Sequence, residues 1–150
     1  MKKFKLVYFL LAASLLLAAT SLAAAGAAGG RPFSTELTGA AEAPGPGDPD
    51  GSGSAKLTLN PGLEQVCWQI SVADVAPITA AHIHKAPAGV AGGVVVPLFL
   101  PLPDADGNSS GCIAADRELI LDIIQNPEEY YVNVHNTDFP AGALRGQLSK

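Results

Sequence analysis

Most of this chain alternates hydrophobic and polar residues with a period of two, the pattern of β-strands that bury one face. The clearest example is residues 63–73, where Val66, Trp68, Ile70 and Val72 alternate with polar or small residues. Gly and Pro residues interrupt the alternation at short intervals and mark turns. On this pattern we predict strands at residues 33–38, 54–60, 63–73, 79–84, 94–99, 130–136 and 143–149.

One segment has a helical period instead. Apolar residues between positions 119 and 124 recur at helical spacing, Asp116 can cap the N-terminus of a helix, and Pro127 ends it. The sequence therefore predicts one short helix near residues 116–125. Seven or eight short strands with this single helix are typical of an all-β fold, and we expect a Greek-key β-sandwich.

The N-terminus has the pattern of a signal peptide. Three lysines precede an apolar run over residues 6–17, and small residues that suit a signal peptidase follow. We assign residues 1–25 to the signal peptide, 26–32 to a flexible N-terminal segment and 33–150 to one domain. The apolar run is short for a membrane span, which needs roughly 20 residues, so an uncleaved anchor is the alternative. This predicts a secreted or periplasmic protein without a membrane span after signal removal.

Charge and cysteine content limit the kinds of partner that this protein can have. The formal net charge is −5, and loss of the three N-terminal lysines leaves 6 basic against 14 acidic residues, or −8. Such an acidic domain is a poor match for nucleic acid or an anionic membrane. Cys67 and Cys112 are the only cysteines. In an oxidising compartment they are expected to form a disulfide, and the alternative is two free thiols that join a copper site.

The only three histidines, His82, His84 and His135, all lie in predicted strands. Side chains two residues apart in a strand point the same way, so His82 and His84 share a face. In residues 130–136 the apolar residues take the opposite face from His135. If these strands and the last one are neighbours, one polar face collects His82, His84, His135, Asn133, Arg145 and Gln147.

Three neutral imidazole nitrogens suit Cu(II), Cu(I) or Zn(II), with water or a carboxylate such as Glu42 completing the shell. The absence of Met from the mature chain argues against a thioether-rich Cu(I) carrier. The alternative is a structural role, in which the histidines hydrogen-bond strand edges and loops, and Arg145 and Glu42 hold neighbouring segments together by polar contacts.

Four segments resemble the signature of the CHRD domain, which is repeated in chordin and occurs singly in many exported bacterial proteins. They are LTGAAEAP at residues 37–44, AHIH at 81–84, NPEEYYVNVH at 126–135 and FPAGALRGQL at 139–148. The resemblance covers about residues 33–150. One departure is Lys85, because the loop after His84 usually begins with Gly in this family.

The domain also looks remotely similar to copper/zinc superoxide dismutases, which share a strand-borne His-x-His and a late Gly-x-x-Arg segment on a Greek-key β-scaffold. Those enzymes need about twice as many metal-binding histidines and an aspartate, so we expect no dismutase activity. No Gly-x-Ser-x-Gly elbow, phosphate loop or dinucleotide fingerprint occurs.

The favoured function is an exported noncatalytic CHRD binding module, with copper or zinc as its ligand. One alternative is an adhesion or matrix protein that binds a polypeptide or polysaccharide and uses its histidines structurally. A second is a metal-dependent enzyme.

Overall fold

The computed structural model describes residues 29–98 and 107–150, so the predicted signal peptide lies outside the described residues. These described residues form eight strands, one α-helix and two short 3-10 helices. In chain order the elements are β1 (Arg31–Thr38), η1 (Gly39–Ala41), β2 (Ser52–Asn60), β3 (Gln65–Ala73), β4 (Ile78–Lys85), β5 (Gly93–Leu98), β6 (Asn108–Ala114), α1 (Arg117–Gln125), η2 (Pro127–Glu129), β7 (Tyr130–Asn136) and β8 (Leu144–Gln147).

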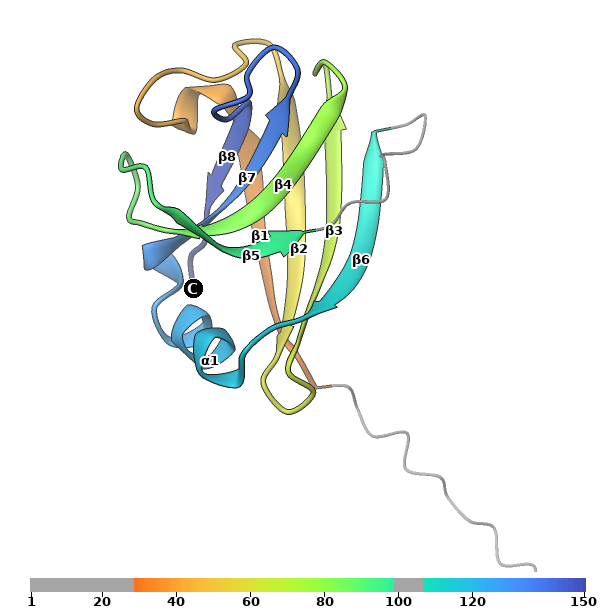
Figure 1. Ribbon diagram of the computed structural model, residues 1–150, viewed down its shortest axis with the longest axis vertical. Helices are drawn as coiled ribbons and strands as arrows, with labels where there is room; N and C mark the ends of the chain where they lie inside the picture. Colours follow the sequence, from red (N-terminus) through yellow and green to blue (C-terminus); the bar gives the residue numbers. More distant parts are fainter. Residues whose placement is uncertain (1–28, 99–106) are drawn as a thin grey trace, which may run out of the picture.

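All eight strands belong to one antiparallel sheet with the order β5-β4-β7-β8-β1-β2-β3-β6. The sheet curls until it is nearly closed, which gives a barrel-like sandwich around one core (Figure 1). The loop between β1 and β2 and the turn between β7 and β8 lie at one end, and α1 and the β2–β3 turn lie at the other (Figure 1). The predicted all-β fold class is confirmed.

The core follows from the predicted alternation of the strands. Phe33, Leu57, Trp68 and Gly111 stand in register across β1, β2, β3 and β6, and Trp68 is only 3% exposed. A Cβ atom at Gly111 would lie 2.6 Å from Cζ2 of the Trp68 ring. Gly111 therefore leaves the space on β6 that the indole on β3 fills.

Strand β6 is the element that the sequence pattern missed. Its residues are small or polar, and only Ile113 among them is a large hydrophobic residue. Pairing with β3 positions the strand, because Cys67 and Cys112 face each other in the register with their Cα atoms 4.0 Å apart. They form a disulfide, so the expected pairing is confirmed and the alternative of two free thiols at a copper site is wrong.

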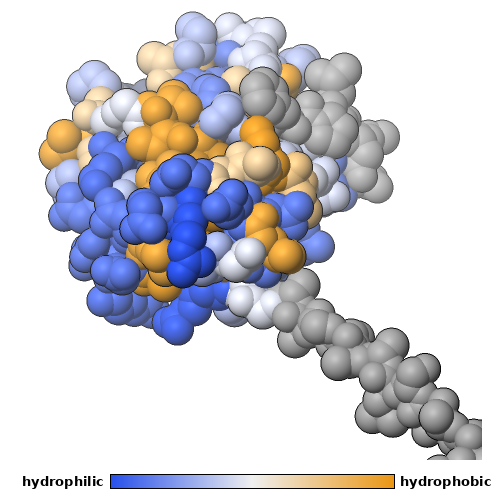
Figure 2. All heavy atoms as spheres, turned by 60° about the horizontal axis from the view of Figure 1, so that its bottom comes forward, coloured by the Kyte–Doolittle hydropathy of each residue, from blue (hydrophilic) through white to orange (hydrophobic). Residues whose placement is uncertain are grey.

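The other elements lie where the pattern placed them, with boundaries shifted by at most two residues, apart from position 99, which lies outside the described residues. Helix α1 begins after Asp116, whose carboxylate accepts hydrogen bonds from the backbone N–H groups of Glu118 and Leu119. Its buried side chains, Ile120 and Ile123, face the core. Hydrophilic residues dominate the surface at this end, with separate hydrophobic patches among them (Figure 2). Within the described part of the chain, no helix has the length and hydrophobicity to span a membrane.

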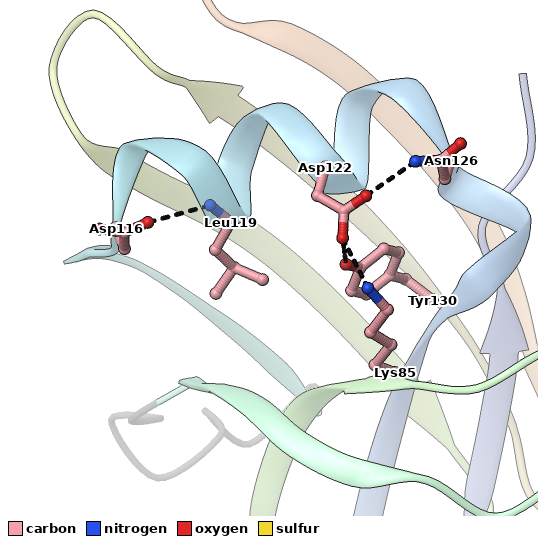
Figure 3. A network of polar contacts seen from close by, with 6 residues as sticks. All are labelled: Lys85, Asp116, Leu119, Asp122, Asn126 and Tyr130. Atoms are coloured by element: carbon pink, nitrogen blue, oxygen red, sulfur yellow. Dashed lines mark hydrogen bonds and ion pairs between the residues drawn. The ribbon is translucent and has the colours of Figure 1, made fainter.

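Lys85, the departure from the family pattern, ties β4 to α1. Its Nζ lies 2.6 Å from Oδ2 of Asp122 and donates to it, and the Tyr130 hydroxyl donates to the same oxygen (Figure 3). The other carboxylate oxygen accepts from Asn126 at 2.7 Å. The lysine and the hydrogen bonds lower the pKa of Asp122 to about 2, so this exposed carboxylate stays ionised and holds the helix against the end of β4.

Candidate functional site

The three histidines meet on the outer face of two neighbouring strands. Strand β4 pairs with β7, with His82 opposite Asn133, His84 opposite Tyr131 and Ala80 opposite His135. The adjacency that the sequence analysis assumed is therefore present. One ligand-capable atom from each histidine lies within 4.8 Å of the other two, and no carboxylate or cysteine of the described residues joins this group.

The imidazole rings contact one another directly. Nδ1 of His82 lies 3.1 Å from Nε2 of His135, and these two ring centroids are 4.9 Å apart. The centroid of His84 is 5.4 Å from that of His82 and 6.1 Å from that of His135. Three nitrogen-bearing rings from two strands thus surround one small volume.

Backbone carbonyls determine which nitrogen of two rings carries the proton. Nδ1 of His84 lies 2.9 Å from the carbonyl oxygen of Gly92, and Nδ1 of His135 lies 3.1 Å from that of Pro140. A carbonyl can only accept a hydrogen bond, so both Nδ1 atoms carry hydrogen and both Nε2 atoms carry a lone pair. Nε2 of His84 is buried and has no hydrogen-bond partner among the described residues.

All three imidazoles are held in the neutral form. Burial, together with the smaller effect of the neighbouring rings of His135 and His84, lowers the pKa of His82 to about 4. Burial also lowers the pKa of His84 and of His135, against the opposing effect of their carbonyl hydrogen bonds. Protons therefore compete weakly for these lone pairs at neutral pH.

A stack of side chains supports His84. Its ring stacks on Tyr131 with centroids 4.9 Å apart and an interplanar angle of 15°. The guanidinium carbon of Arg145 lies 3.5 Å from the centroid of the same tyrosine ring. The Tyr131 hydroxyl accepts a hydrogen bond of 3.1 Å from the backbone N–H of Gly92, the residue whose carbonyl binds His84. Tyr131 thus fixes both the ring and its backbone partner.

Arg145 and Gln147 hold the β4–β5 loop over this face. Arg145 is 1% exposed and donates to the carbonyls of Val90 and Pro87, both at 2.8 Å. It also donates to Oε1 of Gln147 at 3.0 Å, and Nε2 of Gln147 lies 3.0 Å from the carbonyl oxygen of Ala86. The two predicted support residues therefore lie beside the histidines and act by positioning the loop that carries Gly92.

Glu42 lies against Asn133, outside the histidine cluster. Nδ2 of Asn133 donates to Oε1 of Glu42 and lies 3.3 Å from the carbonyl oxygen of Leu144. Burial raises the pKa of Glu42 to about 7, although the charge of Arg145 and the Asn133 hydrogen bond oppose the rise. Gly142 beside it has a φ of 152°, a conformation that favours glycine, and a Cβ atom there would displace the Glu42 carboxylate. The structure therefore does not bring Glu42 to the position of a fourth ligand.

Sequence reasoning missed three contributors to this site. Strand parity places Tyr131 on the same face of β7 as Asn133 and His135, but the sequence pattern assigns it no role there. The carbonyls of Gly92 and Pro140 carry no signal in the sequence, because any residue type supplies a carbonyl and only the loop conformation aims it.

The sequence profile of the CHRD domain matches residues 33–148. The chain belongs to the CHRD domain family. No curated protein and no solved structure matches it, so the distant likeness to copper/zinc superoxide dismutases stays a prediction. CHRD domains are of the binding, non-enzymatic type, and the family and the disulfide are consistent with an extracellular or periplasmic setting.

Proposed function

We propose that this CHRD domain is an exported, noncatalytic module that binds one copper or zinc ion through His82, His84 and His135. The observation that carries the proposal is the pair of nitrogens on His84. One is fixed as a donor to the Gly92 carbonyl, and the other is a buried acceptor without a partner. An imidazole held in this way presents a lone pair to a bound cation.

The hydrogen bonds of Nδ1 in His84 and in His135 also support a metal site. Histidines that bind a metal usually donate their second ring N–H to a carbonyl or a carboxylate, which fixes the tautomer. His84 and His135 both do so, through Gly92 and Pro140. The implied ligands are Nε2 of His84 and His135 and Nδ1 of His82, whose hydrogen, now donated to Nε2 of His135, has to move to its own Nε2 when the ion binds.

The spacing of these nitrogens also fits one ion. Two nitrogens that bind a zinc ion at about 2.0–2.1 Å are at most about 4.2 Å apart. The candidate atoms of the cluster lie within 4.8 Å of one another, and the His82–His135 pair is already at 3.1 Å. Three nitrogens in a tetrahedral or trigonal arrangement around one ion at about 2.0–2.1 Å are about 3.3–3.6 Å apart, so rotations of the rings by about one ångström have to bring the more widely spaced donors together.

A purely structural role explains His84 less well. A buried acceptor without a partner costs about 1–3 kcal/mol, and a phenylalanine could keep the stack on Tyr131 without this cost. The described residues contain one other such atom, Nε1 of Trp68 in the core, but an indole N–H only donates and cannot bind a cation.

Export is supported by the signal-like pattern of residues 1–25 and by the Cys67–Cys112 disulfide, since disulfides persist in oxidising compartments. The noncatalytic assignment is supported by the character of the CHRD family.

The test is metal titration of the mature chain from residue 26 with Cu(II), Cu(I) and Zn(II), each against a competing chelator. We expect one saturable site. His82→Ala and His84→Phe should each weaken binding by roughly 100-fold or more, since each removes a donor and second-shell losses alone cost about 10–100-fold. His84→Phe keeps an aromatic ring on Tyr131.

The matched control is Glu64→Gln, which removes an exposed carboxylate in the β2–β3 turn at the far end of the sheet from the β7–β8 turn. Its affinity should equal that of the wild type. No saturable binding, or binding that survives both histidine substitutions, contradicts the proposal.

A further inference from the structure

We infer that the three-histidine site prefers monovalent copper, Cu(I), over Cu(II) and Zn(II), because its ligands are all neutral and a buried arginine charge lies behind them. This inference rests on the proposed function and specifies the ion.

The donor set brings no negative charge to the ion. The cluster holds three imidazoles and, among the described residues, no carboxylate or thiolate, while both cysteines are in the disulfide. His84 is 8% exposed, so water screens charge poorly on that side. The free-energy cost of burying an ion rises steeply with the charge of the ion. A divalent ion therefore loses more free energy than a monovalent ion on entering such a site.

Arg145 adds a fixed positive charge to this environment. It comes from β8 and His84 comes from β4, the strands on either side of β7, and Tyr131 of β7 contacts both. The guanidinium carbon of Arg145 lies 3.5 Å from the centroid of the Tyr131 ring, on which the His84 ring stacks at 4.9 Å, so the charge of Arg145 lies close to His84. The repulsion between this guanidinium and a bound ion doubles when the charge of the ion doubles.

The arginine charge is not cancelled by a direct ion pair. Its hydrogen-bond acceptors are the carbonyls of Val90 and Pro87 and the amide oxygen of Gln147. The one salt bridge within residues 29–98 and 107–150 joins Lys85 to Asp122. Glu42 is close enough to Arg145 to interact with its charge, but its hydrogen-bond partner is Asn133, so it offsets the guanidinium only from a distance.

The number of donors points to the same ion. Zinc takes four ligands in a tetrahedron and Cu(II) favours a tetragonal arrangement, so each requires at least one further donor. Cu(I), a closed-shell ion without a geometric preference from its d electrons, is satisfied by three. The mature chain has no Met, so the preference arises from charge and coordination number rather than from soft sulfur ligands.

The decisive measurement is the reduction potential of copper bound to the mature chain, recorded by protein electrochemistry at pH 8. A bound couple above the aqueous Cu(II)/Cu(I) couple means that Cu(I) binds more tightly than Cu(II), by thermodynamic linkage. Anaerobic competition with bicinchoninate, using ascorbate as reductant, gives the Cu(I) affinity directly, and chelator competition gives that of Zn(II). We expect Cu(I) to bind at least tenfold more tightly than either divalent ion.

Two charge variants test the cause. Arg145→Gln removes the positive charge and should lower the potential, whereas Glu42→Gln removes a negative charge without a change of shape and should raise it. If Arg145→Gln does not fold, Glu42→Gln alone decides, and an unchanged potential in that variant refutes the electrostatic argument.

The outcomes separate this inference from the proposed function. Tighter binding of Cu(II) or Zn(II) than of Cu(I), still dependent on the histidines, overturns the preference and leaves the metal site intact. Absence of binding by all three ions overturns both.

Discussion

Replacing Arg145 with alanine should destabilise the domain more than any substitution at the surface. Arg145 is 1% exposed, donates to the Val90 and Pro87 carbonyls at 2.8 Å and lies 3.5 Å from the Tyr131 ring centroid. Alanine removes these two hydrogen bonds, the third one to Oε1 of Gln147 and the cation–π contact, and it leaves a cavity where the side chain packed.

The size of this loss follows from the contacts. A hydrogen bond to a charged group contributes about 1.5–3 kcal/mol, and a desolvated cation–π contact contributes about 2 kcal/mol. The β4–β5 loop can relax and let water reach the freed carbonyls, so the total falls below the sum, at about 3–5 kcal/mol. For a domain of this size the melting temperature falls by roughly 10–20 °C.

The assay is urea unfolding of the mature protein at pH 7, followed by circular dichroism and Trp68 fluorescence. The matched control is Arg31→Ala, since Arg31 is exposed and its guanidinium carbon lies 5.9 Å from the Phe33 ring centroid. The control should lose less than about 1 kcal/mol. Wild-type stability in Arg145→Ala, or equal losses in the two variants, would refute the structural role of Arg145.

Three further predictions concern other parts of the fold. Because the pKa of Glu42 is raised to about 7, the stabilising effect of this residue is complete below about pH 4.5 and is lost as the pH rises through about 7. Glu42→Gln should therefore add about 1 kcal/mol of stability at pH 8, after discounting for partial exposure, and little at pH 5. An equal gain at both pH values in thermal melts argues against this. Replacing both Cys67 and Cys112 by Ser removes the disulfide that closes a loop spanning 45 residues and should lower the free energy of unfolding by about 4 kcal/mol. An unchanged urea midpoint would count against this prediction. Gly111→Ala places a Cβ 2.6 Å from the Trp68 ring and should cost about 1–3 kcal/mol with a shift in tryptophan emission, whereas a neutral substitution with an unshifted spectrum would show that the indole has spare room.

Strand parity predicted much of the fold because most strands bury one face. Trp68 and its neighbours on β3 alternate as expected, and so does the outward set on β7 that includes His135. Strand β6 has too few large hydrophobic residues for this signal, since Gly111 makes room for Trp68 and Cys112 is fixed by its disulfide. Its position depends on tertiary pairing rather than on local pattern.

The site was predictable only in part for a related reason. Parity placed His82 and His84 on one face, but the pairing of β4 with β7 joins segments far apart in sequence. The hydrogen bond from His84 to Gly92 depends on the path of the β4–β5 loop, which Arg145 fixes from a third strand. Such contacts are decided by the assembled sheet, so the sequence located the histidines but not the unpartnered nitrogen.

The most direct test of the central claim is a crystal structure of the mature protein soaked with copper or zinc, with anomalous data collected on both sides of the metal edge. We predict one strong anomalous peak at about 2.0–2.1 Å from Nδ1 of His82 and from Nε2 of His84 and His135, with the hydrogen bonds to Gly92 and Pro140 retained. An unbroken His82–His135 hydrogen bond with no peak between the rings, or a peak only at surface carboxylates, would contradict the account.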